Sequence, residues 1–295
     1  MHACGHDGHT AILVMAAKIL SSLKDRLQGS IKFVFEPNEE EVGALAMIEA
    51  GVMENPKVDA AAGLHLWAPL PVGRIAVDPG ACWAGMDHFT IRVLGRGGHT
   101  STPHTAVDPI LVAAHIVTGL QVLQSRTLDP FLASSLVFGR ITGGRAANII
   151  PDEVELEGTI RYLFDGSDEG PHKPRVRLRE LAESLAKAYR AEAEVDFYCS
   201  QPALENDPGM CALGREAAGE TLGGEGGMIK FLNMGGEDFS EFSARVPSVF
   251  AMIGAGSEAS GAVYPHHHPK FRIDEASLGI GLEWLLRTAL KYLKG

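Results

Sequence analysis

The pattern of apolar residues changes character twice along the 295-residue chain, and this change constrains the fold more than any other feature. Up to residue 84, short continuous apolar segments alternate with segments of helical periodicity, as in α/β domains. Residues 85–199 instead contain strands with alternating apolar and polar positions, which indicates an α+β unit. The first pattern returns over residues 200–295. We therefore expect one α/β domain, residues 1–84 and 200–295, interrupted by an inserted α+β domain, residues 85–199.

The spacing of apolar residues also predicts individual elements. For the α/β domain these are helices at 11–27, 39–53, 210–221 and 278–293 and strands at 31–35, 60–66 and 249–253. For the inserted domain they are strands at 89–94, 132–141 and 154–164 and helices at 107–123 and 174–190. The order strand, helix, strand over residues 31–66 predicts a parallel βαβ unit, and open α/β sheets bind ligands at the C-terminal ends of such strands.

Composition and charge exclude several classes of function. The net charge is −11 without a basic patch, which argues against nucleic acid and anionic membrane surfaces as partners. No apolar segment reaches transmembrane length, and no secretory signal is visible. The four cysteines lack the regular spacing of a disulfide framework, so we expect reduced thiols and a cytoplasmic protein.

The first ten residues, M-H-A-C-G-H-D-G-H-T, place a thiol, imidazoles and a carboxylate close together. Cys4 and His6 are good transition-metal ligands, and Gly5 and Gly8 allow the tight backbone that lets such side chains converge. A purification tag or a chance run is the alternative. Cys, Asp and Gly interrupt the run, however, and an amphipathic helix follows it directly, which favours a metal site.

Three further segments carry residues suited to metal binding or acid–base chemistry. They are Glu39–Glu41 at a strand-to-helix turn, His65 at a strand end, and His266–His268 before a proline. Taken alone, an acidic helix start is usually solvated, an apolar strand histidine usually belongs to the core, and a histidine run can be a surface loop. Their coexistence in a chain with 12 His instead suggests a shared site for a pair of divalent ions.

The motifs H-A-C-G-H-D-G-H-T, F-x-P-x-E-E, G-L-H-L-W, G-R-G-G-H, N-I-I-P, G-T-I-R, M-G-G-E-D-F and H-H-P-K-F occur in this order. With this set the chain resembles the metal-dependent amidohydrolases that include hippurate hydrolase, auxin-conjugate hydrolase and bacterial N-acyl-amino-acid deacylases, relatives of aminoacylase and carboxypeptidase G. The resemblance covers essentially the whole chain. It implies an α/β, zinc-peptidase-like catalytic domain with an inserted α+β lid and dimerisation domain. It also implies hydrolysis of N-acyl amino acids to a carboxylic acid and a free amino acid.

The resemblance implies roles for particular residues. Two divalent metal ions per chain (zinc, manganese, cobalt or nickel) are expected at Cys4, His6, Glu40, His65 and His267. His267 is preferred to His268 because the family's ligand stands two residues before the proline. Glu39 is expected to be the general base that activates the attacking water.

In the inserted domain, the resemblance implies that His99 stabilises the oxyanion in a neighbouring subunit's site, so the chain is expected to form a homodimer through this domain. Asn148 and Arg161 are expected to anchor the substrate carboxylate, although Arg161 could equally be a surface residue of a strand. Gly235 is expected to allow close backbone approach to the substrate. The following Glu237 and Asp238 either orient ligands or, as we prefer, cap a helix near residue 239.

The chain departs from the family pattern at three places, one of which is Asn38, where Ala is usual. Glu36 stands where the family has Gln, and the chain begins inside the cysteine–histidine motif, so we expect an N-terminally truncated catalytic domain. One alternative is therefore a non-catalytic truncated fragment that serves as a dimerising or metal-binding module. The other is a dipeptidase or carboxypeptidase, against which Cys4 argues because related peptidases use a bridging carboxylate there.

Overall fold

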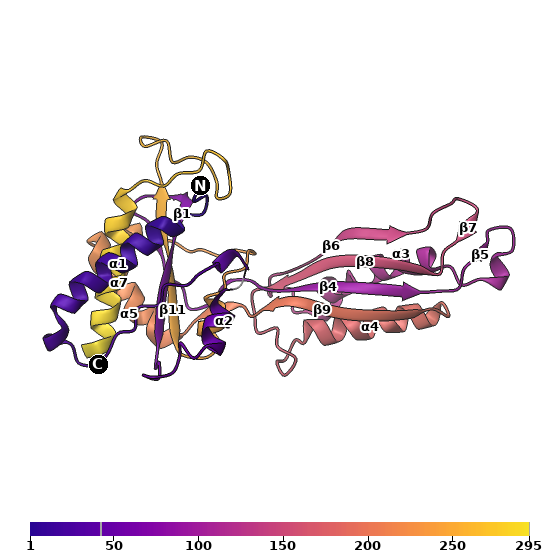
Figure 1. Ribbon diagram of the computed structural model, residues 1–295, viewed down its shortest axis with the longest axis horizontal. Coiled ribbons are helices and arrows are strands. Elements are labelled where there is room, and N and C mark those ends of the chain that lie inside the picture. The colour runs from indigo at the N-terminus through magenta and orange to yellow at the C-terminus, as the bar shows by residue number, and fades with distance from the viewer. Residues whose placement is uncertain (42, 295) are drawn as a thin grey trace. The chain divides into compact units, whose positions relative to one another are not determined.

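The computed structural model describes residues 1–41 and 43–294, and the chain forms two compact units. Unit 1 comprises Met1–Cys82, Leu204–Asn233 and Glu237–Gly295, and unit 2 comprises Trp83–Ala203 and Met234–Gly236. Parallel strands with flanking helices in unit 1 and an antiparallel sheet with helices in unit 2 make the chain a mixed α/β protein (Figure 1). None of the helices among the described residues combines the length and apolar character needed to cross a membrane.

The sheet of unit 1 is built around β11 (Ser248–Gly256), all of whose residues are buried. It pairs in parallel with β1 (Ala61–Pro71) and antiparallel with β2 (Ile75–Ala76). A strand covered on both faces requires a continuous apolar sequence, which β11 has. The parallel register sets His65 of β1 opposite Met252 of β11, in the middle of both strands and not at the strand end that the sequence predicts, because β1 continues to Pro71.

Three helices pack beside this sheet: α1 (His6–Ser22), α5 (Pro208–Leu222) and α7 (Ala276–Lys294) (Figure 1). The buried residues of α1 recur every four positions, from Gly8 to Leu20, so one face of the helix enters the core. Trp284 of α7 is fully buried, and its indole N–H donates to the Gly214 carbonyl at 2.9 Å. This hydrogen bond joins α7 to α5.

Shorter elements complete unit 1. They are the 3₁₀ turns at Lys24–Arg26, Glu39–Glu41 and Glu225–Gly227, α2 (Gly43–Glu49), α6 (Ser240–Ser243), and the paired strands β3 (Gly80–Trp83) and β10 (Leu204–Asn206). Asp207 begins α5 as its N-cap and accepts a hydrogen bond from the Met210 amide at 2.9 Å. The predicted helix at 210–221 thus starts two residues earlier, at the proline that follows this cap.

The predicted strand at 31–35 and the βαβ unit built on it are wrong. Residues 31–35 form no strand, and within the described structure β1 pairs only with β11. The segment is held instead through Lys32, whose ammonium donates to three carbonyls of residues 52–56 at 2.7–3.0 Å. The predicted helix at 39–53 is a 3₁₀ turn followed by the seven-residue α2; Val42 lies outside the described residues.

Unit 2 is a four-stranded antiparallel sheet with α3 (Pro109–Gly119) and α4 (Pro174–Ala188) packed on one face (Figure 1). The strand order is β6 (Ser134–Gly143), β8 (Glu153–Tyr162), β4 (Gly85–Leu94), β9 (Glu192–Gln201). Along β4 and β8 buried residues alternate with partly exposed ones, as a sheet covered on one side requires. The core gathers around Phe89, Ile116 and Leu156.

Unit 2 has four further short elements. They are the short pair β5 (Gly98–His99) and β7 (Ile149–Ile150), a 3₁₀ turn at Pro103–Thr105, and a π turn at Leu123–Thr127. The sequence pattern predicts the other three strands of the sheet but not β9. The predicted helix at 107–123 ends earlier, at Gly119, and its last turn widens into the π turn.

Candidate metal centre

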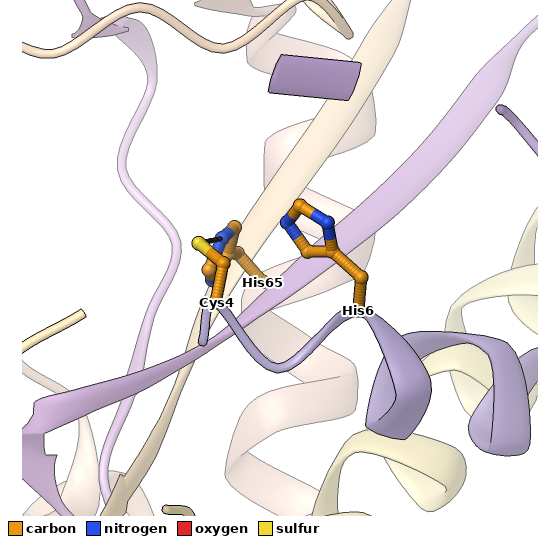
Figure 2. A group of neighbouring side chains, drawn as sticks. All are labelled: Cys4, His6 and His65. Carbon is orange, nitrogen blue, oxygen red and sulfur yellow. Dashed lines mark hydrogen bonds between the residues drawn. The ribbon is translucent and has the colours of Figure 1, made fainter. Parts of the chain in front are cut away.

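Cys4 and His6 converge because Gly5 sits between them in a left-handed conformation, with φ of 88°. Gly5 is the N-cap of α1, so His6 is the first helical residue while Cys4 lies just outside the helix. Figure 2 shows both side chains beside His65, which comes from β1. The N-terminal segment is fixed by the His267 amide, which donates to the Ala3 carbonyl at 2.7 Å.

The donor atoms of Cys4 and His65 have the separation expected of two ligands on one ion. Cys4 Sγ lies 3.5 Å from His65 Nε2. Sulfur and nitrogen ligands of one tetrahedral zinc ion would lie about 3.6 Å apart, given bond lengths near 2.3 and 2.05 Å. The His65 Nδ1–H donates to the Leu66 carbonyl at 2.8 Å, so Nε2 carries the lone pair that faces the sulfur. This pair fits a transition-metal ion.

Two groups of potential ligands share Cys4. In the first, Cys4 lies with His6 and His65, and in the second it lies with Glu40 and His267. Within each group the ligand atoms lie within 4.8 Å of one another. In the second group His267 Nε2 is 3.0 Å from Glu40 Oε1. The structure therefore brings all five predicted metal ligands together, as two adjoining clusters around one thiol.

Burial sets the protonation states of these donors. It lowers the pKa of His6 and His65, which keeps both imidazoles neutral, and only neutral imidazole can ligate a metal. Burial, followed by the charges of Glu40 and Glu39, raises the pKa of the Cys4 thiol. The carboxylate charges around the thiol favour a positive ion in place of the thiol proton.

Glu39, the predicted general base, lies beside these clusters. Its carboxylate is 3.5 Å from His6 Nε2, and its side chain is 24 % exposed. Burial, then the charges of Asp238 and Glu40, raises the pKa of Glu39 to about 7. A carboxyl group that titrates near neutrality suits proton transfer at physiological pH.

Glu237 and Asp238 form a further acidic group with Glu39. Asp238 is fully buried and accepts a hydrogen bond from the Ala44 amide at 2.9 Å, at the N-terminal end of α2. Glu237 accepts one from the Phe239 amide at 3.1 Å, ahead of α6. The side chains thus bind backbone amides near two helix starts, and they also add negative charge next to Glu39.

Two histidines beside the cluster were missed by the sequence reasoning. His9 Nε2 accepts a hydrogen bond from the Leu66 amide at 2.9 Å, and burial lowers the pKa of His9 to about 3. His266 Nδ1 lies 3.4 Å from Cys4 Sγ. Both stand in motifs singled out from the sequence, so the available signal was their spacing: His9 is one α1 turn after His6, and His266 precedes His267.

The predicted residues of unit 2 lie at two places in that unit. His99 pairs with Ile149 between β5 and β7, and the exposed Asn148 accepts a hydrogen bond from the Thr100 amide at 3.1 Å. Arg161 lies opposite Met86 at the other end of the sheet. The residues of β4 from Met86 to Leu94 span about 26 Å at about 3.3 Å per residue. The sheet therefore separates Arg161 from His99 and Asn148 of the same unit.

Arg161 and Gly235 both lie at the end of the unit 2 sheet that is remote from His99. The Arg161 guanidinium is partly buried, which lowers its pKa, and it donates to the Met234 carbonyl at 2.9 Å. The Gly235 carbonyl accepts a hydrogen bond from the Ala84 amide at 3.1 Å. Only one guanidinium nitrogen is used in this contact, so the rest of the fork can bind a carboxylate.

Comparisons with known proteins show what the chain is similar to. The model of Peptidase family M20/M25/M40 matches residues 1–291. The chain is 34% identical over 299 residues to N-acetylcysteine deacetylase of Bacillus subtilis, covering 100% of this chain and 74% of that protein. It is also 34% identical over 298 residues to IAA-amino acid hydrolase ILR1-like 4 of Arabidopsis thaliana, covering 99% and 67%. A solved Bacillus subtilis structure, a dinuclear metal binding peptidase of the M20 family, superposes with a TM-score of 0.82 at 31% identity, covering 100% and 74%.

Proposed function

Because this chain belongs to Peptidase family M20/M25/M40 and is a metal-dependent amidohydrolase, we propose that it hydrolyses N-acyl amino acids to a carboxylic acid and a free amino acid. The names of two relatives, a deacetylase of N-acetylcysteine and a hydrolase of IAA-amino acids, support this class of substrate. The observation that carries the proposal is the sharing of Cys4 between two clusters of ligand atoms, which suits a pair of ions.

The proposed ligands of these ions are Cys4, His6, Glu40, His65 and His267. Their mixture of sulfur, nitrogen and oxygen is compatible with zinc, manganese, cobalt or nickel. When bound, two such ions would polarise the acyl carbonyl and make water a better nucleophile near neutral pH.

Glu39 is the proposed general base. Its raised pKa lets the carboxylate take a proton from the attacking water and, once protonated, deliver it to the departing amine nitrogen. The amide of Asp238 donates a hydrogen bond that holds this carboxylate in place. The carboxyl group of Glu39 thereby transfers the proton from the attacking water to the departing amine.

His99 is proposed to donate a hydrogen bond to the oxyanion. Its Nδ1 accepts from the Ser101 amide at 3.2 Å, so in the neutral ring the proton sits on Nε2. His99 is exposed, which leaves that N–H available as a donor. Arg161, Asn148 and Gly235 are proposed to bind the amino-acid portion, with Arg161 pairing to its carboxylate.

The separation of His99 from Arg161 within unit 2 favours action across a homodimer. One copy would supply Arg161, and the other would supply His99 and Asn148. Exposed apolar side chains on unit 2 support a dimer interface there: Ile110 and Leu111 on α3, and Val137 and Ile141 on β6, are 49–61 % exposed. No disulfide joins the four cysteines, all of which are described, so we propose the reducing cytoplasm as the location.

The test combines activity with metal content. Glu39→Gln should lower turnover of N-acetyl and N-benzoyl amino acids by about 10²- to 10⁴-fold, while two ions per chain remain bound as measured by mass spectrometry. Glu49→Gln, an exposed change on α2, should retain activity. Turnover that survives in the Glu39 variant would refute its role, and metal content near zero in the wild type would instead favour the non-catalytic alternative.

Two extensions separate the remaining possibilities. Mixing inactive His99→Ala and Glu39→Gln chains should restore part of the activity if His99 acts across a dimer, since one mixed site is intact. The solved relative is described as a peptidase, so dipeptides belong in the substrate panel. Preferential cleavage of dipeptides over N-acyl amino acids would make the chain a dipeptidase or carboxypeptidase.

A further inference from the structure

His266 lies next to a proposed metal ligand, but its ring nitrogens are arranged differently from those of His65. The Ala68 amide donates to His266 Nε2 at 3.1 Å. A peptide N–H can only donate, so Nε2 must be the acceptor and the proton of the neutral ring must sit on Nδ1. His266 Nδ1 in turn lies 3.4 Å from Cys4 Sγ. The imidazole of His266 therefore directs an N–H toward Cys4, with the sulfur at 3.4 Å and the Cys4 backbone as a second hydrogen-bond partner.

The Cys4 sulfur thus meets two imidazoles of opposite character. His65 directs a lone pair toward it at 3.5 Å, since the His65 Nδ1–H is used by the Leu66 carbonyl. His266 directs an N–H toward it from another side. A cation can lie between the sulfur and the lone pair of His65. It cannot be bound by His266 unless the hydrogen bond with Ala68 is lost, and His266 belongs to none of the ligand clusters.

Packing holds the His266 ring in this orientation. The ring stacks on Trp67, with centroids 4.2 Å apart and planes at 19°, and it also contacts the rings of Phe271 at 4.8 Å and His65 at 5.3 Å. Trp67 and Ala68 both belong to β1, the strand that also carries His65. The same strand therefore positions the ligand histidine and, through Ala68, the histidine that donates to the sulfur.

We propose that His266 is a positioning residue that donates its Nδ1–H to the Cys4 thiolate and thereby tunes the metal–sulfur bond. The inference rests on the proposed role of Cys4 as a metal ligand. A hydrogen bond to a thiolate withdraws charge from the sulfur and fixes its direction. The loss of such an outer hydrogen bond typically weakens metal binding by about 10- to 100-fold.

Two amide substitutions each preserve one of the two hydrogen bonds of the His266 ring and remove the other. The side-chain nitrogen of Asn occupies the place of Nδ1, so His266→Asn keeps the donor to sulfur and loses the contact with Ala68. The terminal amide of Gln occupies the place of Nε2, so His266→Gln keeps an acceptor for Ala68 and loses the donor. His268→Asn is the matched control, because His268 stacks on Tyr264 at 4.5 Å and its Nδ1 accepts a hydrogen bond from the Lys270 amide at 3.0 Å.

The measurement is cobalt binding to each full chain, followed through the sulfur-to-cobalt charge-transfer absorption and by competition with a chelator. His266→Gln should shift this band to longer wavelength, because the sulfur regains charge, and should weaken cobalt binding by about tenfold or more. His266→Asn and His268→Asn should keep the wild-type band. A purely structural role for His266 would not move the band.

Three outcomes would overturn the inference. If His266→Gln keeps the wild-type band and affinity, no hydrogen bond tunes the sulfur. If His266→Asn matches His266→Gln, the contact with Ala68 or the ring itself is what matters. If the wild type binds cobalt without a thiolate band, Cys4 is not a ligand, and the metal assignment of the proposed function fails together with this inference.

Discussion

The raised pKa of Glu39 predicts how the stability of the metal-free protein depends on pH. Burial and the charges of Asp238 and Glu40 raise this pKa from 4.5 to about 7. Between these values the folded chain holds a proton that the unfolded chain has released, so the free energy of unfolding falls as the pH rises. At about 1.36 kcal/mol per pKa unit, the ionised carboxylate destabilises the fold by about 3 kcal/mol above pH 7.

Glu39→Gln should remove this cost without changing the shape of the side chain. The amide oxygen can still accept the hydrogen bond that the Asp238 amide gives to the carboxylate. In the presence of a chelator, the variant should be more stable than the wild type by about 3 kcal/mol at pH 8, and the two should agree at pH 4.5. The substitution that abolishes catalysis would thus stabilise the metal-free fold.

Urea unfolding followed by circular dichroism at pH 4.5 and pH 8 measures both quantities. Glu49→Gln controls for the loss of a negative charge at an exposed position, and it should change stability by less than about 0.5 kcal/mol. The reasoning is refuted if Glu39→Gln is no more stable than the wild type at pH 8, or if its advantage is equal at both pH values.

Further predictions concern packing and backbone contacts. Gly254→Ala should destabilise by about 1–3 kcal/mol in thermal melts, because the added Cβ would overlap the Pro71 carbonyl oxygen. Gly279→Ala, where a Cβ meets nothing within 4 Å, should stabilise α7 by up to about 1 kcal/mol. Either prediction is contradicted if the melting temperature of its variant equals that of the wild type. Lys32→Met should cost about 1–3 kcal/mol, because it leaves three carbonyls of residues 52–56 without their ammonium, and unchanged urea unfolding would show that water replaces it.

The strand β9 was not predicted, although the alternation of apolar and polar residues in its sequence is sufficient to predict a strand. Its inward residues Ala193, Val195 and Phe197 alternate with polar ones and pack in the core of unit 2. The alternation is therefore visible in the sequence. In the sequence β9 follows the strongly charged α4. Its pairing with β4 covers an edge of β4 that would otherwise be exposed.

The opposite error, a strand predicted at 31–35, has a tertiary cause. The segment has the apolar character of a buried strand, but strand formation requires a partner at hydrogen-bonding distance. Within the described residues β1 pairs on one side only, with β11. Local sequence reports the tendency to be extended, whereas pairing depends on the placement of other segments.

In the candidate site, too, some features can be predicted from the sequence and others depend on the folded chain. The types and spacing of the five proposed ligands could be recognised from the sequence, because side chains that bind metals are few and their motifs are distinctive. The roles of neighbouring histidines could not. His65 and His266 both touch the sulfur of Cys4, yet one offers a lone pair and the other an N–H. That difference is decided by the Leu66 carbonyl and the Ala68 amide, two backbone groups of β1 that carry no side-chain signature. A histidine beside a metal site therefore acquires its role from the backbone that its second nitrogen meets, and only the folded chain supplies that partner.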